Sequence, residues 1–265
     1  MKKFAVALAA SLALALAGCG GGAAPTAADP APGPAEPVVT GAATVFAAAS
    51  LTEAFTEIGE LFEAANPGAT ITFNFAGSTT LAQQILSGAP ADVFASANKE
   101  QMQLVVDAGL AAGEPTVFAT NTLQIVVPEG NPAGVTGLAD FGKEDLKLAI
   151  CAPEVPCGVL ARQLFATAGV TPSVDTLEQD VKAVLTKVRL GEADAGLVYR
   201  TDVASAEGPV EGIDFPEAAT EANEYPIVVL KNAPNPAVAQ AFVDYVLAGD
   251  GTAVLEEFGF TTPAP

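Results

Sequence analysis

From about residue 43 onward, short apolar runs alternate with longer amphipathic segments along the chain. The short runs are rich in β-branched and aromatic residues, which is typical of buried strands, and the longer segments have helical spacing. Strands are predicted at residues 43–47, 70–75, 93–95, 123–127, 148–150, 195–199 and 227–230. Helices are predicted at residues 51–65, 78–87, 100–108, 159–168, 181–189, 236–247 and 252–257. This alternation predicts an α/β fold with parallel sheets covered by helices.

The region that follows the N-terminal segments has about 220 residues, enough for one doubly wound domain or for two lobes. Two extended segments, 120–127 and 221–230, could each cross between lobes as a hinge strand. We therefore expect a first lobe formed by residues 43–121 and 222–265, and a second lobe formed by residues 122–221. A single doubly wound domain is the alternative.

The N-terminus has the pattern of an export signal. Lys2 and Lys3 precede an apolar run, residues 4–17, which is too short to span a bilayer. The run ends in the sequence LAGC, which resembles a bacterial lipoprotein cleavage site and implies that residues 1–18 are removed and Cys19 is lipidated. The alternative is an ordinary secretion signal followed by an incidental cysteine.

Residues 19–42 are dominated by Gly, Ala and Pro and have little to bury, so they predict a flexible or extended tether. With a lipidated Cys19, this tether would hold the folded part at the extracytoplasmic face of the cell membrane.

Composition excludes several classes of function. The net charge is −20, which argues strongly against nucleic acid as a partner because phosphate binding depends on cationic side chains. A small anion is still compatible, since local dipoles can outweigh a screened global charge. The chain contains no histidine, so imidazole metal sites and Ser-His or Cys-His catalysis are not possible.

Several predicted helices begin with small and hydroxyl residues directly after a strand. Ser50 and Glu53 match a capping box, and on its own Ser50 is interpreted as a helix cap. Similar helix starts occur at residues 75–80, 155–158 and 178–181. Each would leave unpaired backbone N–H groups at a positive dipole end, and in α/β sheets such helix starts gather at the carboxyl ends of the strands. The pattern predicts an anion site.

Six segments follow one another between residues 44 and 262: AAASLTEAF, FAGSTTLAQQI, GAPADVFASAN, EVPCG, DVKAVLTKVRLGEADAGLVYRTDV and EEFGF. In this order they resemble the molybdate-binding proteins of bacterial ABC importers. The resemblance implies a type II periplasmic binding-protein fold, in which hinge strands join two α/β lobes. It also implies a tetrahedral oxyanion held in the cleft between the lobes.

The resemblance implies oxyanion ligands from both lobes. These ligands are the hydroxyls of Ser50, Ser78 and Tyr199 and the backbone N–H groups of Cys157 and Val181. Cys157 stands where such relatives commonly have a small residue such as alanine, a difference that a backbone ligand tolerates. Without the resemblance, Tyr199 would be interpreted first as a core tyrosine.

The implied ligands suit molybdate, which carries no proton at neutral pH and therefore needs donors and no acceptor. A phosphate site would gain from a carboxylate, and none of the implied ligands is one, although Asp180 lies next to Val181. No cofactor, bare metal cation or catalytic residue is expected. Arg200 and Lys99 are interpreted either as rim charges that attract the anion or as solvated side chains.

Cys151 and Cys157 have two possible interpretations. In an exported protein a disulfide between them is expected to clamp the loop that precedes the helix at residue 159. A pair of free thiols is the alternative. A redox centre is disfavoured, since the spacing is not Cys-x-x-Cys.

The leading hypothesis is a monomeric, lipid-anchored receptor that delivers molybdate, or tungstate, to the membrane permease of an ABC importer. A receptor for sulfate, phosphate or an organic anion is the second hypothesis. The third is an extracellular hydrolase or sulfur-transfer enzyme that uses Ser50, Ser78 or Cys157, and the missing histidine and Gly-x-Ser-x-Gly motif disfavour it.

Overall fold

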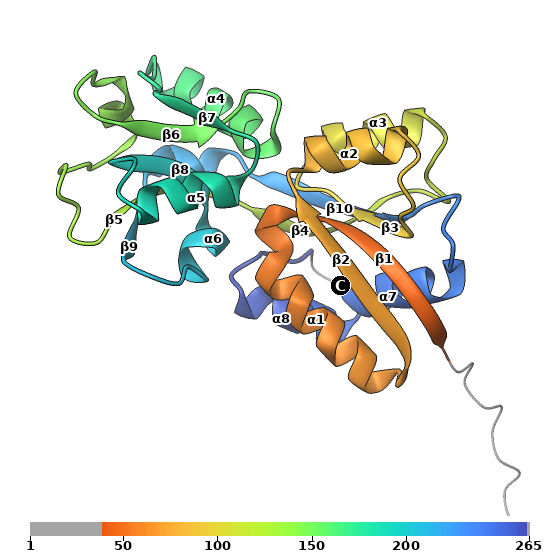
Figure 1. The fold of residues 1–265 in the computed structure, drawn as a ribbon. Helices are drawn as coiled ribbons and strands as arrows, with labels where there is room; N and C mark the ends of the chain where they lie inside the picture. Colours follow the sequence, from red (N-terminus) through yellow and green to blue (C-terminus); the bar gives the residue numbers. More distant parts are fainter. Residues whose placement is uncertain (1–38, 264–265) are drawn as a thin grey trace, which may run out of the picture. The chain divides into compact units, whose positions relative to one another are not determined.

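The computed structural model describes residues 39–263, which form two mixed β-sheets with helices packed against them (Figure 1). The first sheet has the strand order β2-β1-β3-β10-β4. Its strands are β1 (Thr40–Ala48), β2 (Gly68–Ala76), β3 (Val93–Ala95), β4 (Thr116–Asn121) and β10 (Asn223–Val229). Strand β1 is parallel to β2 and β3, whereas β10 is antiparallel to both of its neighbours.

Helices cover both faces of the first sheet because alternate side chains of β1 point to opposite faces. Val45 belongs to a buried cluster with Phe55 and Phe242, whereas the adjacent Phe46 belongs to a separate cluster with Leu81. The helices of this lobe are α1 (Thr52–Ala65), α2 (Ser78–Leu86), α3 (Lys99–Asp107), α7 (Pro236–Leu247) and α8 (Gly249–Glu257). A short 3-10 turn, η1 (Ala49–Leu51), connects β1 to α1.

The second sheet has the strand order β7-β6-β8-β5-β9. Its strands are β5 (Leu123–Pro128), β6 (Leu148–Cys151), β7 (Thr176–Glu178), β8 (Ala195–Tyr199) and β9 (Val210–Ile213). Its helices are α4 (Pro156–Ala168), α5 (Val181–Arg189) and α6 (Arg200–Ala204), with 3-10 turns η2 (Leu138–Gly142) and η3 (Pro216–Thr220). Strand β6 is parallel to β7 and β8.

The chain passes between the two sheets twice, from β4 into β5 and from η3 back into β10 (Figure 1). The two crossings lie side by side, since Asn121 at the end of β4 pairs with Asn223 at the start of β10. Each sheet with its helices forms one lobe. The predicted fold of two α/β lobes is confirmed, and the alternative of one continuous doubly wound sheet is wrong.

Several predicted elements differ from the observed ones at their ends. Helix α4 begins at Pro156 rather than near residue 159, because proline is well suited to the first helical position. Strands β7 and β9, with three and four residues, and helix α6, with five, were not predicted. These segments are too short to display a period of 2 or 3.6 residues, and they lack the continuous apolar run that marks the equally short β3.

The proposed signal segment, Cys19 and most of the tether lie outside the described residues. The predicted limit of the tether at residue 42 is wrong, since Thr40 already begins β1 and pairs with Gly68 of β2. Within residues 39–263, no helix combines the length and the apolar character needed to cross a bilayer.

Candidate anion-binding site

One pocket lies where the two lobes face each other, and it is formed by segments that follow parallel strands. In the first lobe these segments follow β1, β2 and β3; in the second they follow β6, β7 and β8. The carboxyl ends of parallel strands are where α/β sheets place their ligands. The lining residues are Ala48, Ala49, Ser50, Gly77, Ser78, Ala97, Val155, Pro156, Cys157, Asp180, Val181 and Tyr199. All five residues predicted as ligands are therefore brought together.

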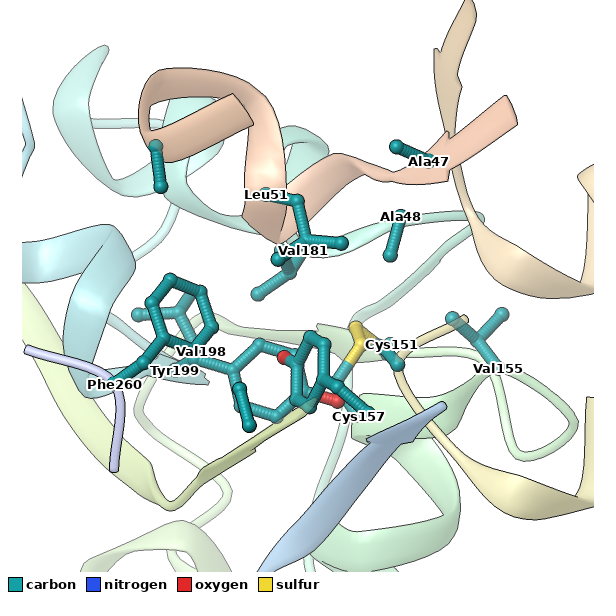
Figure 2. Close-up of a cluster of buried hydrophobic side chains, with 14 of the residues drawn as sticks. Ala47, Ala48, Leu51, Cys151, Val155, Cys157, Val181, Val198, Tyr199 and Phe260 are labelled. Carbon is teal, nitrogen blue, oxygen red and sulfur yellow. A yellow bond between two sulfur atoms is a disulfide. The ribbon is translucent and has the colours of Figure 1, made fainter. Parts of the chain in front are cut away.

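The pocket is small and closely surrounded. Its cavity volume is about 10 Å³. In Figure 2, Ala48 from β1 and Val181 from α5 face the same space as Tyr199 from β8, with Cys157 beside them. The small residues before Ser50 and Ser78 allow the backbone to come close to whatever occupies this space.

Four helical starts meet at the pocket: η1, α2, α4 and α5. The first three have no hydrogen bond from a side-chain cap. At the fourth, the Asp180 carboxylate accepts a hydrogen bond of 2.9 Å from the N–H of Ala183. The first N–H groups of a helix have no partner within the helix, and together with the helix dipole they favour an anion. The arrangement is therefore suited to negative charge.

Ser50 does not form the predicted capping box. It lies inside η1, one turn before α1, and its Oγ is 2.9 Å from the hydroxyl of Tyr225. Glu53 does not reach back to the serine, because its carboxylate pairs with Lys182 at 2.8 Å. The interpretation of Ser50 as a helix cap is wrong, since the 3-10 turn places it within the helical segment rather than at its flank. Ser50 is buried at the pocket, beside the second crossing strand.

Ser78 is the first residue of α2 and is buried. Its Oγ accepts a hydrogen bond of 2.9 Å from the N–H of Ala97, which follows β3. Because a hydroxyl has one hydrogen and two lone pairs, this contact leaves the Ser78 hydrogen to be donated into the pocket. The same hydrogen bond ties the start of α2 to the end of β3.

Cys157 and Val181 are at the starts of the second lobe's helices. Cys157 is the second residue of α4 and Val181 is the first of α5, and both side chains are buried. A disulfide joins Cys157 to Cys151 at the end of β6, with Cα atoms 5.8 Å apart. At Gly158 an added Cβ would lie 1.9 Å from the carbonyl oxygen of Ala152, so the first turn of α4 packs directly on the preceding loop.

Tyr199 ends β8, and its ring is fully buried at the pocket. Its hydroxyl oxygen accepts a hydrogen bond of 2.6 Å from the side-chain amide of Asn223. Burial raises the pKa of Tyr199 well above its usual value, while its side-chain hydrogen bonds with Asn223 and Tyr225 act in the opposite direction. The hydroxyl therefore stays protonated at neutral pH and can act as a donor.

Of residues 39–263, no lysine or arginine lines the pocket. Lys182, next to Val181, instead pairs with Glu53 of the first lobe at 2.8 Å and with the buried Asp202 at 3.0 Å. Burial raises the pKa of Asp202 to about 6, and the charge of Lys182 opposes this shift. This network connects the lobes and neutralises the nearest cation.

Arg200 and Lys99 are both exposed and lie outside the pocket lining. Arg200 is 3.4 Å from Asp214, and Lys99 pairs with Glu224. Their interpretation as ordinary solvated side chains agrees with these contacts. Among residues 39–263 there is no group of three or more His, Cys, Asp or Glu residues that could hold a metal ion.

The lobes approach closely at Gly77, where an added Cβ would lie 2.2 Å from the backbone oxygen of Gln179. Nearby, the hydroxyl of Thr79 donates a hydrogen bond of 2.9 Å to the carbonyl of Glu154. The small residue at Gly77 was visible in the sequence, although its facing partner was not. Asn223 and Tyr225, which contact Tyr199 and Ser50, carried no local signal because they lie 24 and 175 residues away.

Residues 43–261 match the family described as bacterial extracellular solute-binding proteins. The molybdate-binding protein ModA of Mycobacterium tuberculosis is 48% identical over 219 residues, spanning 83% of this chain and 84% of that protein. ModA of Escherichia coli is 33% identical over 238 residues, spanning 83% and 89%.

The periplasmic molybdate-binding protein of Azotobacter vinelandii has the same fold, with a TM-score of 0.73 at 20% identity, over 84% of this chain and 100% of that one. The relatives are named as binding proteins, and family membership places the chain among binding proteins rather than enzymes. The chain belongs to the bacterial extracellular solute-binding proteins, in the family that includes the molybdate-binding protein ModA.

Proposed function

We propose that this protein binds molybdate between its lobes and delivers it to the permease of an ABC importer. One observation carries the proposal: among the described residues, those lining one pocket come from both lobes and include neutral hydrogen-bond donors but no cationic side chain. The proposed ligands are the hydroxyls of Ser50, Ser78 and Tyr199 and the N–H groups of Cys157 and Val181. The relatives named as molybdate-binding proteins support the same ligand.

The donor set selects against a protonated anion. At neutral pH, monohydrogen phosphate keeps one proton, which needs an acceptor, whereas molybdate needs donors alone. Asp180 is the only acidic residue in the described part of the chain that lines the pocket, and its carboxylate caps α5 through Ala183. The pocket therefore favours a fully deprotonated dianion.

Charge alone does not separate molybdate from sulfate, because both are dianions. Donors held by helix starts and by buried contacts, such as that of Ser78 with Ala97, are spaced for one size of anion. Sulfate has shorter bonds and would lose some of these contacts. Each lost charge-assisted hydrogen bond weakens binding by about 1.5–3 kcal/mol, so two lost contacts weaken sulfate by at least about a hundredfold. Tungstate is nearly the same size as molybdate and is proposed to bind as well.

Calorimetric titration of the purified protein with molybdate, tungstate, sulfate and phosphate tests the proposal. We expect sub-micromolar binding of molybdate, about −8 kcal/mol or better. Tyr199→Phe should weaken molybdate by about tenfold or more, since it removes one charge-assisted donor. Tyr245→Phe is the matched control, because that tyrosine packs against Phe62 in the first lobe. Sulfate or phosphate binding as tight as that of molybdate would refute the proposal.

We also propose that the protein is a monomer held at the membrane by a lipid on Cys19. The support is the LAGC sequence at residues 16–19 after an apolar run, together with a family described as extracellular. Cys19→Ser should release the protein from the membrane fraction or leave its signal uncleaved. Normal processing with unchanged membrane retention in this variant would rule out the lipid anchor.

A further inference from the structure

Asn223 lies where the two crossing strands and the pocket meet. It is the first residue of β10 and pairs with Asn121 at the end of β4. Its side-chain nitrogen is 2.6 Å from the hydroxyl oxygen of Tyr199 and 3.1 Å from the carbonyl oxygen of Pro156. One amide from the crossing strand thus contacts β8 and the first residue of α4.

These two contacts define the direction of the hydrogen bond to Tyr199. The carbonyl oxygen of Pro156 can only accept, so the nitrogen end of the Asn223 amide must face it. The same nitrogen then donates its second hydrogen to the oxygen of Tyr199. Because a phenol has one hydrogen, the Tyr199 hydrogen cannot point back at Asn223 and is left for the pocket, which Tyr199 lines, or for the neighbouring hydroxyl of Tyr225.

We propose that Asn223 is a positioning residue that orients the Tyr199 hydroxyl as a donor to the bound oxyanion. This inference rests on the proposed function. It adds the reason why Tyr199 acts toward the bound anion only as a donor. Fixing that direction suits a fully deprotonated dianion and disfavours one that must donate a proton. Burial supports this role, since it raises the pKa of Tyr199 and keeps the hydroxyl protonated.

Asn223→Asp reverses the polarity of the contact with little change in shape. Asn223 is only half-buried, so at pH 8 the new carboxylate is ionised and accepts the hydrogen of Tyr199. Molybdate then loses one charge-assisted donor and is repelled by the new charge. Asn223→Ala removes the amide without adding charge and leaves the hydroxyl free to rotate.

A double-mutant cycle with Tyr199→Phe separates these effects. Molybdate is titrated calorimetrically at pH 8 against wild type, the Asp and Ala variants of Asn223, Tyr199→Phe and both double variants. Charge repulsion acts in both backgrounds, whereas the oriented donor exists only with Tyr199 present. The loss caused by Asn223→Asp should therefore be at least about tenfold smaller in the Tyr199→Phe background. For Asn223→Ala we expect about a threefold to tenfold loss with Tyr199 and almost none without it.

Thermal unfolding of each variant shows whether it folds, and the Ala cycle decides the question if the Asp variant does not. Equal losses in both backgrounds would mean that Asn223 only braces the crossing strand, and the inference would be overturned. If the wild-type protein does not bind molybdate but binds sulfate or phosphate, the proposed function is overturned instead. In that case the same cycle, run with the bound anion, still tests the role of Asn223.

Discussion

The two lobes contribute to the pocket in different chemical forms. The first lobe presents the hydroxyls of Ser50 and Ser78, each held by a second contact within or beside its own sheet. The second lobe presents the helix starts at Cys157 and Val181, where the available donors are backbone N–H groups, together with Tyr199. Side-chain donors can be deleted by one substitution, whereas backbone donors can only be displaced.

This difference predicts how each lobe responds to mutation. In the first lobe, removing one atom removes one donor. In the second, the Tyr199 hydroxyl can be deleted in the same way, but the positions of the backbone donors depend on packing such as the contact of Gly158 with Ala152 and on the disulfide at Cys157. Substitutions there should act through geometry, and the following experiments test that distinction.

The largest effect is expected at the boundary between the lobes. Gly77→Ala would place a Cβ 2.2 Å from the backbone oxygen of Gln179, so the lobes could not approach as closely. Molybdate affinity should fall at least about a hundredfold, because donors of one lobe lose contact with the anion. The backbone at Gly77 has φ −58, which alanine adopts readily, so thermal stability should not fall. Calorimetry and thermal unfolding measure the two quantities.

Gly113→Ala is the control for this substitution, since nothing lies within 4 Å of an added Cβ there. It should bind molybdate like the wild type. If Gly77→Ala also bound normally, close approach of the lobes at this point would have no part in binding.

Deleting a hydroxyl of the first lobe should have the next largest effect. Ser50→Ala and Ser78→Ala should each weaken molybdate by about tenfold to a hundredfold, the value of one charge-assisted hydrogen bond. Ser78→Ala should also lower the free energy of unfolding by about 1–3 kcal/mol, because the buried N–H of Ala97 loses its partner. Ser87→Ala, at the exposed opposite end of α2, is the control for both measurements. If both serine variants bind molybdate as tightly as the wild type, the hydroxyls of the first lobe do not bind the anion.

Removing the disulfide of the second lobe should affect stability more than binding. Replacing both Cys151 and Cys157 by serine should lower the free energy of unfolding by about 2 kcal/mol, from the entropy of the closed loop. The N–H at residue 157 survives, so molybdate affinity should fall by less than about tenfold. Denaturant unfolding and calorimetry give the two values. A loss of affinity as large as that of the serine variants would contradict a backbone ligand.

The smallest effect concerns the buried Asp202 beside Lys182. Its pKa is raised by burial from 3.8 to about 6, so between these values the folded state binds more protons than the unfolded state. Stability from this group therefore falls as the pH rises through that window. When the pH is lowered from 7 to 5, the free energy of unfolding of the wild type should rise by about 1 kcal/mol relative to that of Asp202→Asn. Denaturant unfolding measures both values. If the free energy of unfolding changes with pH in the same way in both proteins, Asp202 does not titrate in this range.

The elements with many residues and a regular pattern could be predicted from the sequence. Helices α5 and α7 and strand β8 have their predicted limits, since their apolar positions and flanking turn residues are local properties. Strand β3, with only three residues, was predicted from its continuous apolar run. The candidate ligands were also found in this way, by small and hydroxyl residues at helix starts and by the resemblance of six segments to one family. The short elements β7, β9 and α6 were missed because they contain too few residues to show a period and, unlike β3, no continuous apolar run.

The contacts that complete the site could be determined only by the tertiary structure. The sequence around Ser50 matches a helix cap, yet its hydroxyl faces Tyr225, which is 175 residues away and packs against Phe260 of the closing EEFGF segment. Asn223 likewise contacts Tyr199 only because the crossing strand brings β10 to the second lobe. The sequence by itself thus determined which donors and helix starts exist, because capping and periodicity depend on near neighbours. The directions and partners of these donors depend on how the chain folds back on itself between the two sheets.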